Sequence, residues 1–178
     1  MTSRNRFRDG IVCAMPRYKY DWHKICAILP VYLRDGTNGT QIIYDGGTCE
    51  TVPNRVQWVL DDLLGYLHTS REVLVHQCKQ YMSKDARRVP LIVSEEFCLM
   101  PVKGREELCK GDGTVGYIVT KKLMYFVSGE GKRMAYFIGG GCVEVLDTQR
   151  TLSANMKLIQ ELRDKVLWQS TQSQSVGA

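Results

Sequence analysis

Residues 115–146 carry the most regular pattern in the chain, VGYIVTKKLMYFVSGEGKRMAYFIGGGCVEVL. Short apolar runs alternate there with turns such as Ser128-Gly129-Glu130-Gly131 and Gly139-Gly140-Gly141. Apolar runs of this length, closed by glycine-rich turns, are typical of strands joined in hairpins. The pattern predicts strands at 115–120, 123–127, 134–138 and 142–146, which follow one another as an antiparallel meander.

The rest of the chain adds further strands and three helical segments. Asn54 is a candidate cap for a helix in which Val56, Val59, Leu60, Leu63, Leu64 and Leu67 recur at helical spacing. A second helix is expected to begin at Ser70, and a third carries its apolar residues between Leu152 and Val166. The other expected strands are 11–15, 25–33, 41–44, 49–52, 91–93 and 97–102.

These elements predict an α+β fold, mainly an antiparallel sheet with a helical insert at about 54–83 and a C-terminal helix. The 178 residues suit one domain, which we expect at 21–168, between a flexible basic arm at 1–20 and a flexible polar tail at 169–178. No apolar run approaches the roughly 20 residues that span a bilayer, so we expect no membrane partner. The seven scattered cysteines favour reduced thiols in the cytoplasm.

The sequence offers little enzyme chemistry. Gly129-Glu130-Gly131-Lys132 lacks the spacing of a phosphate-binding loop, and adjacent carboxylates such as Glu95-Glu96 diverge on a strand or helix. His23, His68 and His76 lack zinc-ligand spacing. We therefore expect no catalytic residues, no metal and no cofactor.

Positive charge is concentrated in two segments. The net charge of +5 divides into +5 for residues 1–34, −4 for 35–78, +4 for 79–133 and zero for 134–178. Such asymmetry is typical of a surface that meets nucleic-acid phosphates, although a solvated basic surface without a polyanion partner produces it equally well. Mobile arginines such as Arg4, Arg6 and Arg8 can enter the minor groove of A·T-rich DNA.

The order of several short motifs resembles the ComK family of competence transcription factors. The residues that carry the resemblance are Ala27-Ile28-Leu29-Pro30, Ser70-Arg71, Arg88-Val89-Pro90-Leu91-Ile92-Val93, Phe97-Cys98-Leu99-Met100-Pro101-Val102, Gly116-Tyr117-Ile118-Val119 and Ser153-Ala154-Asn155. Together they cover roughly residues 25–160. The chain departs from the family pattern in lacking a tryptophan near Gly116-Tyr117 and a threonine or serine after Pro101, and in its longer leucine-rich helix at 56–67.

The resemblance implies a non-enzymatic transcriptional activator that binds double-stranded A·T-rich DNA through the minor groove, works as a dimer or tetramer, and has a proteolytic adaptor as a further partner. Our hypothesis for the DNA-binding residues is Arg71, Arg87, Arg88, Lys121, Lys122, Lys132 and Arg133. Activation and repression both remain open. The alternatives are a protein-interaction module that presents the helix at 56–67, for which core packing is the simpler interpretation, and a small enzyme with a concave polar pocket.

Overall fold

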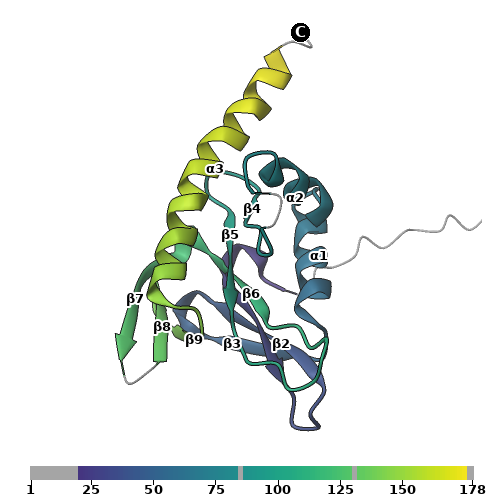
Figure 1. Ribbon diagram of the computed structural model, residues 1–178. Coiled ribbons are helices and arrows are strands. Elements are labelled where there is room, and N and C mark those ends of the chain that lie inside the picture. Colours follow the sequence, from purple (N-terminus) through teal and green to yellow (C-terminus); the bar gives the residue numbers. More distant parts are fainter. Residues whose placement is uncertain (1–19, 84–85, 130–131, 176–178) are drawn as a thin grey trace, which may run out of the picture.

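The computed structural model describes residues 20–83, 86–129 and 132–175, with side chains up to Trp168 (Figure 1). The strand expected at 11–15 and nearly all of the arm expected at 1–20 lie outside these residues. The strands are β1 (Ile25–Tyr32), β2 (Asn38–Tyr44), β3 (Cys49–Val52), β4 (Leu91–Ile92), β5 (Cys98–Lys103), β6 (Val115–Val119), β7 (Leu123–Gly129), β8 (Lys132–Phe137) and β9 (Cys142–Val145). The α-helices are α1 (Val56–Tyr66), α2 (Arg71–Lys79) and α3 (Gln149–Ser175), and the 3-10 turns are η1 (Trp22–Lys24), η2 (Asp45–Gly47) and η3 (Thr120–Lys122).

The fold is α+β, as the sequence predicts, and the strand pairs are antiparallel. Six strands form one sheet in the order β3-β2-β1-β6-β5-β4, and β7-β8-β9 form a second, smaller sheet. β1 and β2 form a hairpin that turns at Gly36, where the Leu33 N–H donates to the Thr37 carbonyl across the turn. Gly36 has a φ of +80°, a conformation that glycine adopts without strain.

The predicted meander is wrong at its first strand. β6 does not pair with β7 but lies inside the large sheet, where Ile118 faces Ala27 of β1 and Val119 faces Leu99 of β5. The link between β6 and β7 is the turn η3 and not a hairpin. Both Ile118 and Val119 are fully buried although they point to opposite faces, and a strand that is apolar on both faces is stable only at the centre of a covered sheet.

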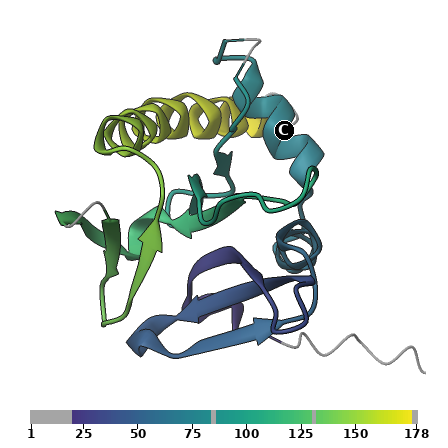
Figure 2. The same ribbon diagram turned by 60° about the horizontal axis from the view of Figure 1, so that its bottom comes forward.

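The large sheet is covered on both faces (Figures 1 and 2). One face packs against α1, where Val59, Leu60, Leu63 and Leu64 are completely buried. The helix at 56–67 therefore contributes to the core, which favours the simpler of its two interpretations. The expected cap at Asn54 is wrong, because Arg55 precedes the helix and the Asn54 carbonyl instead accepts the Thr40 hydroxyl at 2.5 Å. Ser70 does cap α2.

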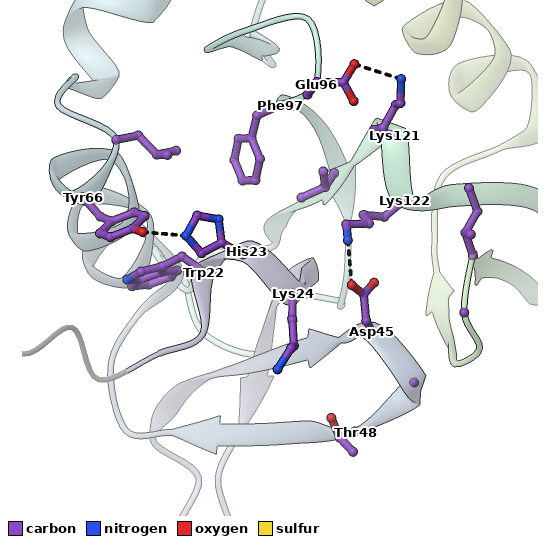
Figure 3. A pocket seen from close by; sticks show the side chains of 15 residues that line it. Trp22, His23, Lys24, Asp45, Thr48, Tyr66, Glu96, Phe97, Lys121 and Lys122 are labelled. Carbon is purple, nitrogen blue, oxygen red and sulfur yellow. Dashed lines mark hydrogen bonds and ion pairs between the residues drawn. The ribbon is translucent and has the colours of Figure 1, made fainter.

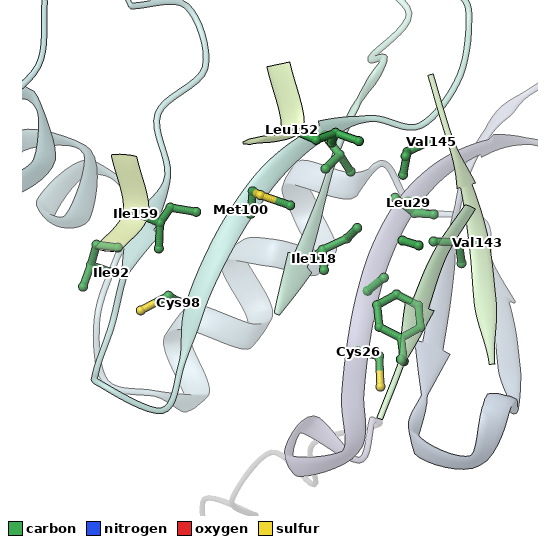
Figure 4. Packing of buried hydrophobic residues seen from close by; sticks show 14 of the residues in the cluster. Cys26, Leu29, Ile92, Cys98, Met100, Ile118, Val143, Val145, Leu152 and Ile159 are labelled. Atoms are coloured by element: carbon green, nitrogen blue, oxygen red, sulfur yellow. The ribbon is translucent and has the colours of Figure 1, made fainter. Parts of the chain in front are cut away.

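The other face packs against the small sheet and α3 (Figure 4). Its core contains Met100 and Ile118 of the large sheet, Phe137 of the small sheet, and Leu152 and Ile159 of α3. α3 continues to Ser175, so it includes much of the segment that we assigned to the tail, and its C-terminal part extends beyond the rest of the molecule (Figure 1). No helix within the described ranges has the length and apolarity needed to cross a membrane.

Two glycine-containing turns, one from each sheet, are in close backbone contact. Gly47 in η2 and Gly141 in the β8–β9 turn pack backbone against backbone, so closely that a Cβ atom on Gly141 would lie 2.7 Å from the Gly47 Cα. Both residues have positive φ, +77° and +89°. Contact at this distance requires that neither residue has a side chain.

Candidate nucleic-acid interface

Three of the seven predicted DNA-binding residues line one continuous depression. A hollow of about 460 Å³ is lined by Arg71, Arg87 and Arg88, and it adjoins a second hollow of about 210 Å³. The two hollows share Gln57, Arg71, Val115 and Tyr117. We call the combined depression the basic groove.

Helix α2 forms one wall of the basic groove. Arg71, Val75 and Lys79 recur every four residues, so they lie on one face of the helix and all three line the groove. The eight-residue separation of Arg71 and Lys79 corresponds to about 12 Å along the axis, which matches the rise of three to four base pairs of DNA. Helix α2 therefore places two positive charges, Arg71 and Lys79, at a separation close to the length of three to four base pairs.

The floor of the basic groove is the paired end of β5 and β6. Pro101 and Tyr117 lie opposite each other across these strands, and both line the groove with Val115. Burial raises the pKa of Tyr117, so its hydroxyl stays protonated at neutral pH. The floor is thus uncharged, and the charges stand on the walls.

Positive charge dominates the lining. Its cationic residues are Arg55, Arg71, Lys79, Arg87, Arg88 and Arg105, whereas Glu72 is the acidic residue among those that line it. Arg55, Lys79 and Arg87 are exposed, and within the described parts of the chain none of them forms an ion pair. Among the described residues, the ion pairs of Arg71 are long, 3.9 Å to Asp61 and 3.8 Å to Glu72. These four side chains can reach an anion.

The other two cations of the groove are engaged in internal contacts. Arg88 donates to the buried Asp147 carboxylate at 2.5 Å, and the same carboxylate accepts the Lys103 backbone N–H at 2.5 Å. Asp147 thereby ties the loop before β4 to the end of β5. Arg88 was one of the predicted DNA-binding residues, and this ion pair gives it a structural role.

Arg105 is almost completely buried and organises the loop between β5 and β6. Its guanidinium donates to the carbonyls of Val31 and Gly113 at 2.7 and 2.8 Å, and it stacks 3.8 Å above the Tyr32 ring. The Tyr32 hydroxyl in turn donates to Asp112 at 2.6 Å. This network shapes one end of the groove, where Arg105 is a fixed positive charge in the lining.

The remaining predicted residues lie outside the groove. Lys121 pairs with Glu96 at 3.0 Å, Lys122 with Asp45 at 2.6 Å, and Lys132 with Glu144 at 3.3 Å. Arg133 lies on β8 opposite Val145 of β9. The fold thus separates these four residues from the groove, and three of the four have carboxylate partners.

Sequence reasoning missed Arg55 and Lys79. Neither residue belongs to a basic run, so charge counting could not single them out. The four-residue spacing of Arg71, Val75 and Lys79 was the available signal, because it predicts that both cations share one helix face. Arg55 had no comparable signal, since it stands alone between Asn54 and the buried Val56.

A larger cavity of about 950 Å³ lies at one end of the strands β1, β2, β5 and β6 of the large sheet (Figure 3). Its apolar side includes Trp22, Tyr66 and Phe97, and its polar side includes the pairs Lys122–Asp45 and Lys121–Glu96. His23 hydrogen-bonds to the Tyr66 hydroxyl at 2.6 Å. The polar groups thus bind one another, although the cavity has the size and lining of a small-molecule site.

The Cys26 thiol donates a hydrogen bond to Asp45, one of the residues that line this cavity. Burial, followed by its hydrogen bond to Asp45, raises the pKa of the Cys26 thiol to about 12. A thiol with this pKa is protonated and unreactive at neutral pH. Cys78 and Cys98 are also buried, whereas Cys49, Cys109 and Cys142 are exposed.

The described parts of the chain contain no cluster of three or more His, Cys, Asp or Glu side chains that could hold a metal ion. The chain matches no protein-family model, no curated protein and no solved structure.

Proposed function

We propose that this protein binds double-stranded DNA through the basic groove and acts in transcription control. The observation that carries the proposal is the charge of the groove, in which Arg55, Arg71, Lys79 and Arg87 stand on the walls with Glu72 as the acidic neighbour. Four exposed or loosely held cations along one depression attract the phosphate backbone, because each contact releases counterions from the DNA.

The ComK resemblance adds detail to the proposal. It implies an activator that recognises A·T-rich sites through the minor groove as a dimer or tetramer, in the cytoplasm and with a proteolytic adaptor. Arg71 supports this link, because it matches the family's arginine-containing helix and lines both hollows. Arginine is suited to a narrow, electronegative minor groove.

The test is fluorescence-polarisation binding to an A·T-rich duplex and a G·C-rich duplex of equal length, across a salt series. We expect tighter, salt-dependent binding to the A·T-rich duplex. The double variant Lys79→Gln/Arg87→Gln should reduce the slope of log K against log salt by about 2, close to 1 for each lost phosphate contact.

The matched control is Lys121→Gln/Lys132→Gln, which removes the same net charge from residues already paired with carboxylates. This variant should leave the slope and the A·T preference unchanged. Equal losses for both double variants would show that net charge governs binding and would overturn the assignment to the groove. Absence of binding by the wild type at low salt would overturn the function itself.

The cavity beside Trp22 supports a second candidate function, the binding of a small molecule. Its volume and mixed aromatic and polar lining are the observations that favour it. A ligand screen by thermal shift, with Phe97→Ala as the cavity variant, distinguishes this function from DNA binding, because the cavity and the basic groove share no lining residue.

A further inference from the structure

Strand β7 is an edge strand with unusual surface chemistry. It pairs with β8 on one side and is the terminal strand of the small sheet. Its seven residues, Leu123 to Gly129, include no charged residue and no proline. Natural edge strands are normally protected against pairing by lysine, proline, short length or a covering element. Within the described residues β7 has none of these protections, although a register shift between Leu123 and Tyr125 interrupts its pairing with β8.

Exposed apolar side chains gather on this strand. Met124, Tyr125 and Val127 are 54%, 49% and 44% exposed, and Ile138 beside the start of the strand is 52% exposed. Tyr125 and Val127 lie on the same face of the sheet, opposite Tyr136 and Met134 of β8. The Tyr125 and Tyr136 rings stand 5.2 Å apart. The strand thus combines an open backbone edge with an apolar side-chain surface.

We propose that β7 is a self-association surface, on which the β7 strand of a second copy of this chain pairs in antiparallel orientation. A two-fold axis near Phe126 would bring Tyr125 of one copy opposite Val127 of the other, so the two small sheets would join into one continuous sheet. This proposal rests on β7 alone and is independent of whether the basic groove binds DNA.

The choice of a second β7 follows from a comparison of the sheet edges. The other edge strands of the described chain are shorter, since β3 and β9 have four residues each and β4 has two. Self-pairing of β3 or β9 would also place Glu50 or Glu144 near its own copy, and like charges across a strand pair are destabilising. β7 brings no charge to such a pair and offers apolar contacts instead.

The expected affinity is modest. A strand of seven residues is about 23 Å long, and a single strand pair is a small interface beside stable dimers that bury roughly 800 Å² per partner. We therefore expect association that depends on protein concentration. A strand pair should also protect the outward-facing β7 amides from hydrogen exchange.

The first experiment is light scattering after size exclusion of the full chain over a range of concentrations. The mass should rise with concentration from that of the 20.3 kDa chain towards twice this value. Val127→Lys should keep the protein monomeric, because a lysine on the outer strand would be buried unpaired in the interface. The matched control is Leu108→Lys, which places the same charge on a 74% exposed side chain in the β5–β6 loop and should still associate.

The second experiment needs no variant, so it remains decisive even if Val127→Lys does not fold. Hydrogen exchange of the wild type, measured by mass spectrometry, should slow in β7 peptides as concentration rises, while β9 peptides stay unchanged. A wild type that remains monomeric at all concentrations overturns the proposal. So does a dimer that Val127→Lys leaves intact, or β7 protection that does not depend on concentration and so assigns the edge to the same chain.

Discussion

The contact between Gly47 and Gly141 permits a sharp test of how the two sheets are held together. Replacing Gly141 with alanine imposes two separate penalties. An L-residue in the left-handed region costs about 1–2 kcal/mol, and Gly141 has a φ of +89°. The new Cβ would also stand 2.7 Å from the Gly47 Cα, and relieving such overpacking against backbone typically costs about 1–3 kcal/mol. We therefore expect Gly141→Ala to lower the free energy of unfolding by about 2–5 kcal/mol.

The control is Gly139→Ala in the same turn. Gly139 has a similar φ of +86°, but a Cβ there would meet its nearest neighbour, the Gly46 backbone nitrogen, only at 3.9 Å. It should therefore suffer the conformational penalty alone, about 1–2 kcal/mol. In a domain of this size, each kcal/mol lowers Tm by roughly 2–4 °C. Thermal and urea unfolding of both variants measure the difference, and equal destabilisation would refute the close packing of the turns.

Two further predictions concern a buried and a half-buried carboxylate. Asp147→Ala should lower the free energy of unfolding by about 3 kcal/mol in urea titrations, because it leaves Arg88 unpaired and the Lys103 N–H without its acceptor. Asp147→Asn keeps an acceptor and should lower the free energy of unfolding clearly less. Equal losses for the two variants would contradict this role of Asp147. Hydrogen bonds from Tyr32, then Asn38, then the Cys109 N–H lower the pKa of Asp112 to about 2 from about 3.8. A lowered pKa stabilises the fold above the unfolded value, so this contribution should disappear as pH falls from about 4 to 2, and Asp112→Asn should flatten urea stability across that window.

The sequence predicts local structure well because local structure depends on neighbouring residues. The spacing of Val59, Leu60 and Leu63 determines the buried face of α1, and the strand boundaries follow the glycine turns. The division into two sheets was not predictable in the same way. Whether β6 joins β7 or β1 depends on which partner buries Ile118 and Val119 better, and that information lies far away in the chain.

In the candidate interface, too, the sequence predicts what depends on neighbouring residues but not what depends on distant ones. Arg71 and Arg87 could be named from the resemblance and from a basic cluster, and the fold places both in the groove. Lys122 could not be removed from the list by sequence reasoning, because its partner Asp45 is 77 residues away. Charge runs identify where cations are frequent, whereas distant carboxylates determine which of these cations remain available to a ligand.

The central place of β6 has a consequence for how the protein is made. β1 obtains its second neighbour only from β6, and the paired residues Ala27 and Ile118 are 91 positions apart. A nascent chain that has reached β3 can therefore form a three-stranded ribbon in which β1 is still an open apolar edge. Closure of the sheet must wait for nearly two-thirds of the chain to leave the ribosome, and a loop of this length makes that closure slow. Until then, the N-terminal strands are the part of the molecule most exposed to aggregation during synthesis.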